Sequence, residues 1–192
     1  MPKIVDRDRY RKELLEKCFD LFAQKGYGSL TMRRVAKELG VSTGTLYHYF
    51  PSKEALFIQL IEQITEQDIL IMTDKVERQA TIEEKITVLN HYVAENEEYF
   101  YKQTLIYCNF FQQPELQHQE VKETIQKSLQ RYQRFIMDYL DTESVEIANL
   151  ILYFLDGLMF HRAFDPEAVN IIEQMNLLGK IVTVYLARES NS

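Results

Sequence analysis

Residues 30–53, LTMRRVAKELGVSTGTLYHYFPSK, constrain the fold of this chain more than any other stretch. They predict two short helices joined by a tight turn. Thr31 and Ser42 are residues that cap helix N-termini, and Gly40 can take the left-handed conformation that ends a helix. The first helix is expected to bury one apolar face, formed by Val35, Ala36 and Leu39.

The second helix, Thr43 to Tyr49, is unusual because it offers little to a protein core. Only Leu46, and Phe50 just after it, are expected to be buried. Its other side chains are hydrogen-bonding groups without evident partners in the chain. Seven residues cannot hold a helix on their own, so the protein must fix this segment and present it to something polar. The major groove of DNA is a partner of that kind.

The pattern L-T-x-R-x-V-A-x-x-L-G-V-S-x-G-T-L-Y-x-Y-F-x-x-K resembles the DNA-binding signature of the TetR (tetracycline repressor) family of bacterial transcription regulators. With the helices on either side, the resemblance covers about positions 8–60. It implies a helix-turn-helix regulator that binds double-stranded DNA. The positions that match the family's DNA contacts are Thr31, Arg33, Thr43, Gly44, Thr45, Tyr47, His48, Tyr49 and Lys53.

The chemistry of these side chains suggests different roles. Arg33 is the best candidate for reading guanine, because its guanidinium fork matches O6 and N7. Thr43 and His48 can both be turned toward base edges, although contact of His48 with a phosphate is the alternative. Gly44 has no side chain and lets the backbone approach the groove.

Other side chains suit the DNA backbone. Lys53 lies beside a helix N-terminus, where its charge and free backbone N–H groups favour a phosphate. Ser42 is interpreted as a cap. The hydroxyl groups of Thr45, Tyr47 and Tyr49 can donate hydrogen bonds to phosphate oxygens. Such contacts position the protein on DNA without reading its sequence.

The net charge of −7 is distributed unevenly. Residues 1–53 contain eleven Lys and Arg against six Asp and Glu, whereas residues 54–192 contain eleven against twenty-three. The two segments therefore carry +5 and −12. This asymmetry indicates that the N-terminal part meets a polyanion and the remainder does not.

The whole chain is expected to be all-α, with about nine helices, no strands and no internal repeat. We predict a helix-turn-helix DNA-binding domain at 1–53 and a larger helical effector-binding and dimerisation domain at 54–192. The fourth helix should run from the boundary to about Arg78 as a rigid lever. The remaining helices are expected at about 8–25, 82–94, 97–112, 115–140, 144–164 and 167–187.

Helix-turn-helix proteins usually bind DNA as dimers. The last two helices are apolar enough for a symmetric interface, and the resemblance implies that they pair with their copies as a four-helix bundle. Gly157 and Ala148 would allow close approach of helices. The alternative is that both helices are interior helices of a monomer.

The resemblance also implies that the C-terminal domain binds a small-molecule effector, and its many aromatic residues favour an apolar or aromatic one. Polar groups among them are expected to be buried and to need partners. Asp156 and His161 could instead pair at the dimer interface. The candidate effector residues are Tyr107, Asn109, Phe110, Asn149, Asp156 and His161.

Other classes of protein are disfavoured by missing motifs. The sequence has no phosphate-binding glycine loop, nucleophile elbow or H-E-x-x-H motif, so we expect no enzyme and no cofactor. Its four histidines lack metal-ligand spacing, and Cys18 and Cys108 form no disulfide framework, so no metal site is expected. No signal peptide or membrane span is evident, which predicts a soluble, cytoplasmic protein without membrane contact.

Two modes of regulation remain open at this point. Repression is the commoner mode of the family, and release of the operator by an effector would follow from it. The alternative is a DNA-binding regulator without an effector, acting constitutively or through a protein partner.

Overall fold

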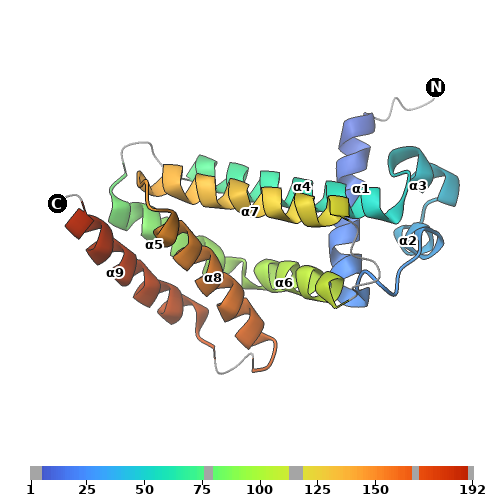
Figure 1. Ribbon diagram of the computed structural model, residues 1–192. Helices are drawn as coiled ribbons and strands as arrows, with labels where there is room; N and C mark the ends of the chain where they lie inside the picture. The colour runs from blue at the N-terminus through green and yellow to red at the C-terminus, as the bar shows by residue number, and fades with distance from the viewer. Residues whose placement is uncertain (1–5, 76–79, 113–118, 166–168, 190–192) are drawn as a thin grey trace. The chain divides into compact units, whose positions relative to one another are not determined.

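The computed structural model describes residues 6–75, 80–112, 119–165 and 169–189. Every regular element in these ranges is an α-helix, so the predicted all-α fold is confirmed (Figure 1). The expected end of the fourth helix at Arg78 and start of the seventh at Glu115 lie outside the described residues. The helices are α1 (Arg7–Lys25), α2 (Met32–Leu39), α3 (Thr43–Tyr49), α4 (Lys53–Lys75), α5 (Ile82–Glu95), α6 (Glu97–Phe111), α7 (Gln119–Leu140), α8 (Val145–Arg162) and α9 (Ile171–Glu189).

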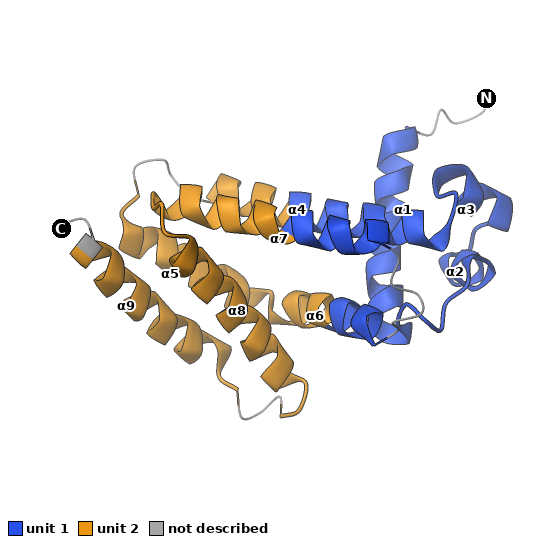
Figure 2. Cartoon of the chain, in the orientation of Figure 1, with its two compact units in different colours: residues 1–66, 105–128 blue, residues 67–104, 129–192 orange. Residues whose placement is uncertain are grey.

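The chain packs as two compact units (Figure 2). Unit 1 comprises residues 1–66 and 105–128, and unit 2 comprises residues 67–104 and 129–192. The helix α4 therefore contributes residues to both units. This division reflects packing, and the functional boundary after residue 53 stays a prediction.

Unit 1 has an aromatic core. Phe22 of α1, Tyr27 of the following turn, Phe57 of α4 and Phe110 of α6 are each at most 1% exposed. Phe57 lies 4.8 Å from Tyr27 and 5.1 Å from Phe110 between ring centroids. Aromatic pairs at these separations add to the free energy gained by burial, so the four rings fix α1, α4 and the end of α6 together.

The start of α1 and its end are set by local chemistry. The Asp6 carboxylate accepts hydrogen bonds from the backbone N–H groups of Asp8 and Arg9, which would otherwise lack partners. Gly26 ends the helix with φ of +73°, a value that side chains disfavour. The chain then turns toward α2.

In unit 2, α5 and α9 pack closely at Gly179. A Cβ atom placed there would lie 2.5 Å from Cγ2 of Ile86, which is too close for any real contact. Next to this point the buried Asn90 donates a 3.1 Å hydrogen bond to Asn176. Glycine is therefore needed at 179 for the two helices to approach.

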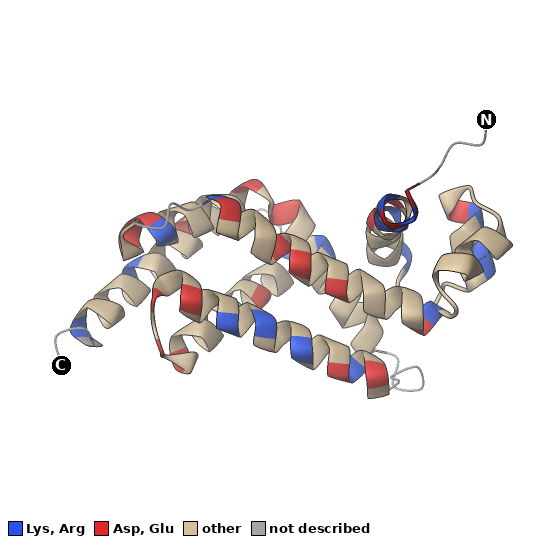
Figure 3. Cartoon of the chain, turned by 90° about the horizontal axis from the view of Figure 1, so that it is seen from above, with Lys and Arg blue, Asp and Glu red and all other residues tan. Residues whose placement is uncertain are grey.

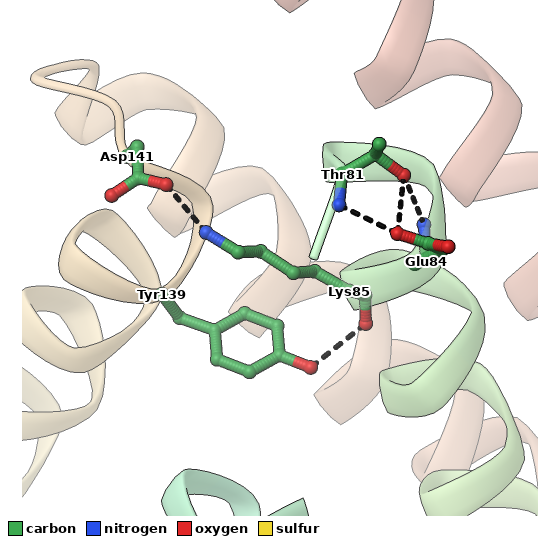
Figure 4. Close-up of polar contacts among 5 residues, drawn as sticks. All are labelled: Thr81, Glu84, Lys85, Tyr139 and Asp141. Atoms are coloured by element: carbon green, nitrogen blue, oxygen red, sulfur yellow. Dashed lines mark hydrogen bonds and ion pairs between the residues drawn. The ribbon is translucent and has the colours of Figure 1, made fainter. Parts of the chain in front are cut away.

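The first turn of α5 is anchored by polar contacts (Figure 4). Thr81 and Glu84 form the reciprocal capping box expected of their spacing. Lys85 is buried and pairs with the exposed Asp141, while the Tyr139 hydroxyl donates a 2.8 Å hydrogen bond to the Lys85 carbonyl. These contacts tie α5 to the end of α7 within unit 2.

Across the described part of the chain, no helix combines the length and apolar character that crossing a membrane requires.

Candidate nucleic-acid interface

The helices α2 and α3 begin and end as the sequence predicts. The Thr31 hydroxyl accepts a 3.3 Å hydrogen bond from the Arg34 backbone, and Ser42 Oγ accepts one of 2.9 Å from the Thr45 backbone. Gly40 is left-handed, with φ of +69°, and Val41 N–H donates back to the Ala36 carbonyl at 3.0 Å. The sharp turn is thus closed by satisfied backbone groups.

The helix α3 is held by two side chains and exposes the rest. Leu46 and the capping Phe50 are fully buried. Tyr47 is 49% exposed, and Gly44 and His48 are also exposed. A short helix fixed from one side in this way presents its polar face outward.

Two α3 side chains are partly engaged within unit 1. The Thr45 hydroxyl lies 2.8 Å from Ser42 Oγ, so it belongs to the cap as well as to the surface. The Tyr49 ring packs 5.6 Å from that of Tyr10 on α1 and is half-buried. Thr43 is half-buried at the start of the helix.

His48 has a partner that sequence reasoning missed. The Arg7 guanidinium, on the first turn of α1, donates a 2.5 Å hydrogen bond to His48 Nε2. Arginine can only donate, so Nε2 is the accepting nitrogen and the ring proton lies on Nδ1. This contact places a permanent positive charge beside α3, a helix with no acidic or basic residue except His48. Figure 3 colours the Lys and Arg residues of the chain blue and its Asp and Glu residues red.

Lys53 is predicted to contact a phosphate, but its ammonium group also makes hydrogen bonds within the chain. Its ammonium group donates to the carbonyl oxygens of Tyr27 at 3.0 Å and Leu30 at 2.9 Å, and it stands 4.1 Å from the centroid of the Tyr27 ring. Burial lowers the pKa of Lys53, and the neighbouring Glu54 opposes this. Two of its three N–H groups are thus used to hold the turn between α1 and α2.

The predicted contacts on α2 are exposed. Thr31 and Arg33 both lie on the surface, Thr31 at the N-cap and Arg33 in the first turn. Arg34, next to them, donates a 3.4 Å hydrogen bond to the Ser29 carbonyl. In unit 1, basic residues therefore gather on the first turns of α1 and on α2, the two helices that precede α3 in the sequence.

Residues 14–60 match the family model described as bacterial regulatory proteins of the tetR family. This match spans the end of α1, both helices of the motif and the start of α4.

Residues 14–60 are therefore similar to the DNA-binding domain of TetR-family regulators.

Several curated relatives are named as transcriptional regulators. A stretch of 50 residues is 48% identical to the uncharacterized regulator YuxN of Bacillus subtilis, covering 26% of this chain and 17% of that protein. The regulator PksA of B. subtilis is 26% identical over 179 residues, 88% of this chain and 86% of PksA. The negative regulator IcaR of Staphylococcus epidermidis is 21% identical over 168 residues, covering 85% and 89%. Several relatives are matched over less than half of their own length.

Solved structures share the fold over nearly the whole chain. A TetR transcriptional regulator from Legionella pneumophila has a TM-score of 0.73 at 15% identity and covers 93% of this chain and 98% of its own. The regulator FadR of B. subtilis, solved with stearoyl-CoA, has a TM-score of 0.67 at 20% identity and covers 88% and 96%. The TetR-family fold therefore extends beyond the matched residues 14–60.

Three of the six candidate effector residues lie in unit 1. Phe110 is fully buried in the aromatic core described above, where its ring contacts Tyr27 and Phe57. Asn109 donates to the Leu105 carbonyl at 2.9 Å within its own helix. Tyr107 is half-buried.

The other three lie in unit 2 on α8. Asn149 is half-buried and accepts a 2.8 Å hydrogen bond from Gln133. The expectation that Asp156 and His161 are buried is wrong, because both are exposed. The side chain of Asp156 reaches solvent, but partial burial of its carboxyl group raises the pKa of that group. The six candidates therefore do not form one cluster.

Sequence reasoning also missed Asp68, a buried carboxylate on α4 within unit 2. The available signal was weak: Asp68 directly precedes the apolar residues at 69–72, but Glu62 and Glu66 lie on the same helix.

Proposed function

We propose that this TetR-family regulator is a repressor that binds a palindromic operator as a homodimer and is released by a small effector with an apolar or aromatic body. The observation that carries the proposal is the polar face of α3, which is fixed by the buried Leu46 and Phe50 and directed away from the core. A helix presented in this way suits the major groove.

Within this proposal the DNA contacts divide by exposure. Arg33, Tyr47 and His48 are exposed and can reach base edges or phosphates. Thr43, Thr45 and Tyr49 are half-buried and suit phosphates at the edge of the contact, while Gly44 lets the backbone approach. Lys53 would act first by positioning the turn before α2, with one N–H group left for a phosphate.

The homodimer is supported by an exposed apolar surface on the last two helices. Nine of the fourteen large hydrophobic side chains that are exposed in the described ranges lie at positions 145–185. Most fall at helical spacing on one face of each helix, which is the pattern of an uncovered interface rather than of scattered surface residues. They are Val145, Leu150, Tyr153, Phe160, Phe164, Leu177, Ile181, Val184 and Tyr185.

Gly157 lies within this surface, which we call the α8–α9 face. A Cβ atom there would meet nothing within 4 Å, so a helix of a second copy could approach closely. Ala148 cannot serve in the same way because it is fully buried. Asp156 and His161 are exposed beside the same stripe, which favours their interface role over effector binding.

Repression and release by an effector are supported by the names of two similar proteins. IcaR is named a negative regulator, and FadR was solved with stearoyl-CoA. In this chain, release would follow if an effector binds more tightly to a dimer shape whose α3 helices no longer match one face of DNA. The shift in operator affinity can equal only that difference in effector affinity.

The test is selection of bound DNA from a random pool by the full chain, repeated with metabolite extracts. A palindromic consensus that certain extracts release supports the proposal. A consensus that no extract releases indicates the regulator without an effector. Failure to enrich any sequence contradicts the operator-binding function itself.

A further inference from the structure

Unit 2 contains a buried carboxylate that accepts hydrogen bonds only from neutral groups among its described partners. Asp68 on α4 is 5% exposed. Its Oδ1 accepts a 2.8 Å hydrogen bond from the Tyr99 hydroxyl. Its Oδ2 accepts one of 2.6 Å from the Tyr132 hydroxyl and one of 3.1 Å from Gln103 Nε2. Both carboxyl oxygens act as acceptors at short distances from hydroxyls, as expected of an ionised group.

This arrangement is costly for a protein that uses Asp68 only for packing. A buried charge is expensive unless a counter-ion and hydrogen bonds offset its desolvation. Desolvation raises the pKa of Asp68, and the hydrogen bonds from Tyr132, Tyr99 and Gln103 oppose that shift. Within the described ranges, the hydrogen-bond partners of Asp68 are two hydroxyls and an amide. A buried carboxylate with a perturbed pKa is a candidate for function.

Aromatic rings surround the carboxylate. Phe100 packs edge-on against Tyr99 at 5.4 Å and against Tyr92 at 5.7 Å between centroids. Burial, and to a smaller extent the charge of Asp68, raises the pKa of Tyr92 to about 12, so this ring lies within the field of the carboxylate. Ring faces and a carboxylate together favour cations.

The chain already places one ammonium on this cluster. Lys75 Nζ lies 5.6 Å from the centroid of the Tyr92 ring. Lys75 itself is exposed, at the end of α4. The outer ring of the cluster is therefore able to receive a positive charge.

Gln103 is the partner that a ligand can replace most easily. Its amide nitrogen is shared between Asp68 at 3.1 Å and the Tyr132 hydroxyl at 3.3 Å, which are long contacts. It is also half-buried, whereas Asp68 is buried. A cationic group in its place would supply the charge that the amide lacks.

We propose that Asp68 anchors an organic cation, a protonated amine or quaternary ammonium with an apolar body, which displaces the Gln103 amide and packs on Tyr92, Tyr99 and Tyr132. This inference rests on the proposed function for its role, since it names the class of effector. Binding itself is measured without DNA.

The probes are 2-phenylethylammonium and benzyltrimethylammonium, compared with neutral 2-phenylethanol and anionic phenylacetate, titrated into the full chain by calorimetry. The wild type should bind both cations at least about tenfold more tightly than the alcohol, as a desolvated charge pair and ring contacts predict. Equal binding of cation and alcohol, or tighter binding of phenylacetate, would overturn the proposal.

Two variants and a control separate ligand binding from a structural role. Asp68→Asn should abolish the preference for cations, whereas Asp74→Asn, on the exposed part of the same helix, should retain it. Gln103→Leu removes the competing amide and should strengthen cation binding by about threefold, because one neutral hydrogen bond no longer has to be broken. If Asp68→Asn does not fold, unchanged or weaker cation binding by Gln103→Leu overturns the proposal.

Failure of the two proposals can be told apart with an operator fragment. Cation binding by a chain that selects no DNA would contradict the repressor function and leave the Asp68 site intact. Operator release by neutral or anionic compounds alone, with no cation bound, would contradict the Asp68 site and leave the repressor function intact.

Discussion

The Arg7 guanidinium donates a 2.5 Å hydrogen bond to Nε2 of His48, across 41 positions of the chain. It joins the first turn of α1 to α3 and leaves His48 Nδ1–H as the donor that can face DNA. Arg7 thereby supplies a charge that α3 does not have. We expect the two residues to act as one unit in DNA binding.

A double-mutant cycle tests this unit. Arg7→Ala and His48→Ala should each weaken operator binding, and the coupling between them should be about 0.5–1 kcal/mol, because residues in direct contact are not additive. The measurement is affinity for the selected operator at fixed salt. Arg9→Ala is the matched control, since Arg9 pairs with Glu13 on its own helix. Losses of operator binding free energy that simply add in the double variant would contradict the view that Arg7 and His48 act as one unit.

Lys53 should matter for folding as well as for DNA. Lys53→Met removes the donor to the Tyr27 and Leu30 carbonyls, so the free energy of unfolding should fall by about 1–2 kcal/mol. Urea denaturation measures this. Lys37→Met, at an exposed position of α2, should change stability far less. Equal effects of the two substitutions would show that the Lys53 contacts do not stabilise the turn.

The α8–α9 face should carry the dimer. Ile181→Glu and Tyr153→Glu would each bury a charge without a partner in the interface and should raise the dimer dissociation constant by at least about 100-fold. Sedimentation across a concentration series measures this. Leu70→Glu alters a side chain of unit 2 that is 58% exposed outside this face and should leave the dimer intact. Dimers that survive both changes on the face would place the interface elsewhere.

Two helical glycines should respond oppositely to alanine. Gly179→Ala forces a Cβ atom against Ile86 and should cost about 1–3 kcal/mol of stability. Gly157→Ala meets open space within the chain and should gain up to about 1 kcal/mol from helix propensity. Both are measured by urea denaturation in the Ile181→Glu background, so that dimerisation does not contribute. A neutral Gly179→Ala would contradict the close approach of α5 and α9.

Asp68 should make stability depend on pH in a defined direction. Desolvation raises its pKa in the folded state, so the folded chain holds this proton where the unfolded chain has lost it. Its contribution is fully present below the ordinary value of 3.8 and is lost as pH rises through the folded pKa. The stability of wild type relative to Asp68→Asn should therefore fall as pH rises from about 4. Asp156, whose pKa is also raised, is present in both proteins and cancels. A relative stability that rises with pH would contradict this assignment.

Local features of the fold could be predicted from the sequence, because their causes are local. The caps at Thr31 and Ser42, the left-handed Gly40 and the Thr81–Glu84 capping box each depend on residues within a few positions. The burial of Leu46 and Phe50 followed from the same short stretch.

Contacts between distant residues could not be predicted in this way. Asp68 meets partners 31, 35 and 64 positions away, and Lys53 meets carbonyls 23 and 26 positions away. The aromatic ring of Phe110 suits an effector site as far as the sequence shows, but the aromatic core of unit 1 encloses it. A polar residue on an apolar helix does not reveal which neighbour it faces, as Asp156 and His161 illustrate.

The central claim is that the polar face of α3 reads DNA, and the most direct measurement is the ratio of affinities for the selected operator and for random duplex. Tyr47→Ala and His48→Ala should each lower this ratio by at least about fivefold, because each lost base contact costs roughly 1–3 kcal/mol. Both substitutions should leave the helical fold unchanged. Lys37→Met should lower affinity for both duplexes alike. Ratios that remain at the wild-type value in both α3 variants would contradict the claim.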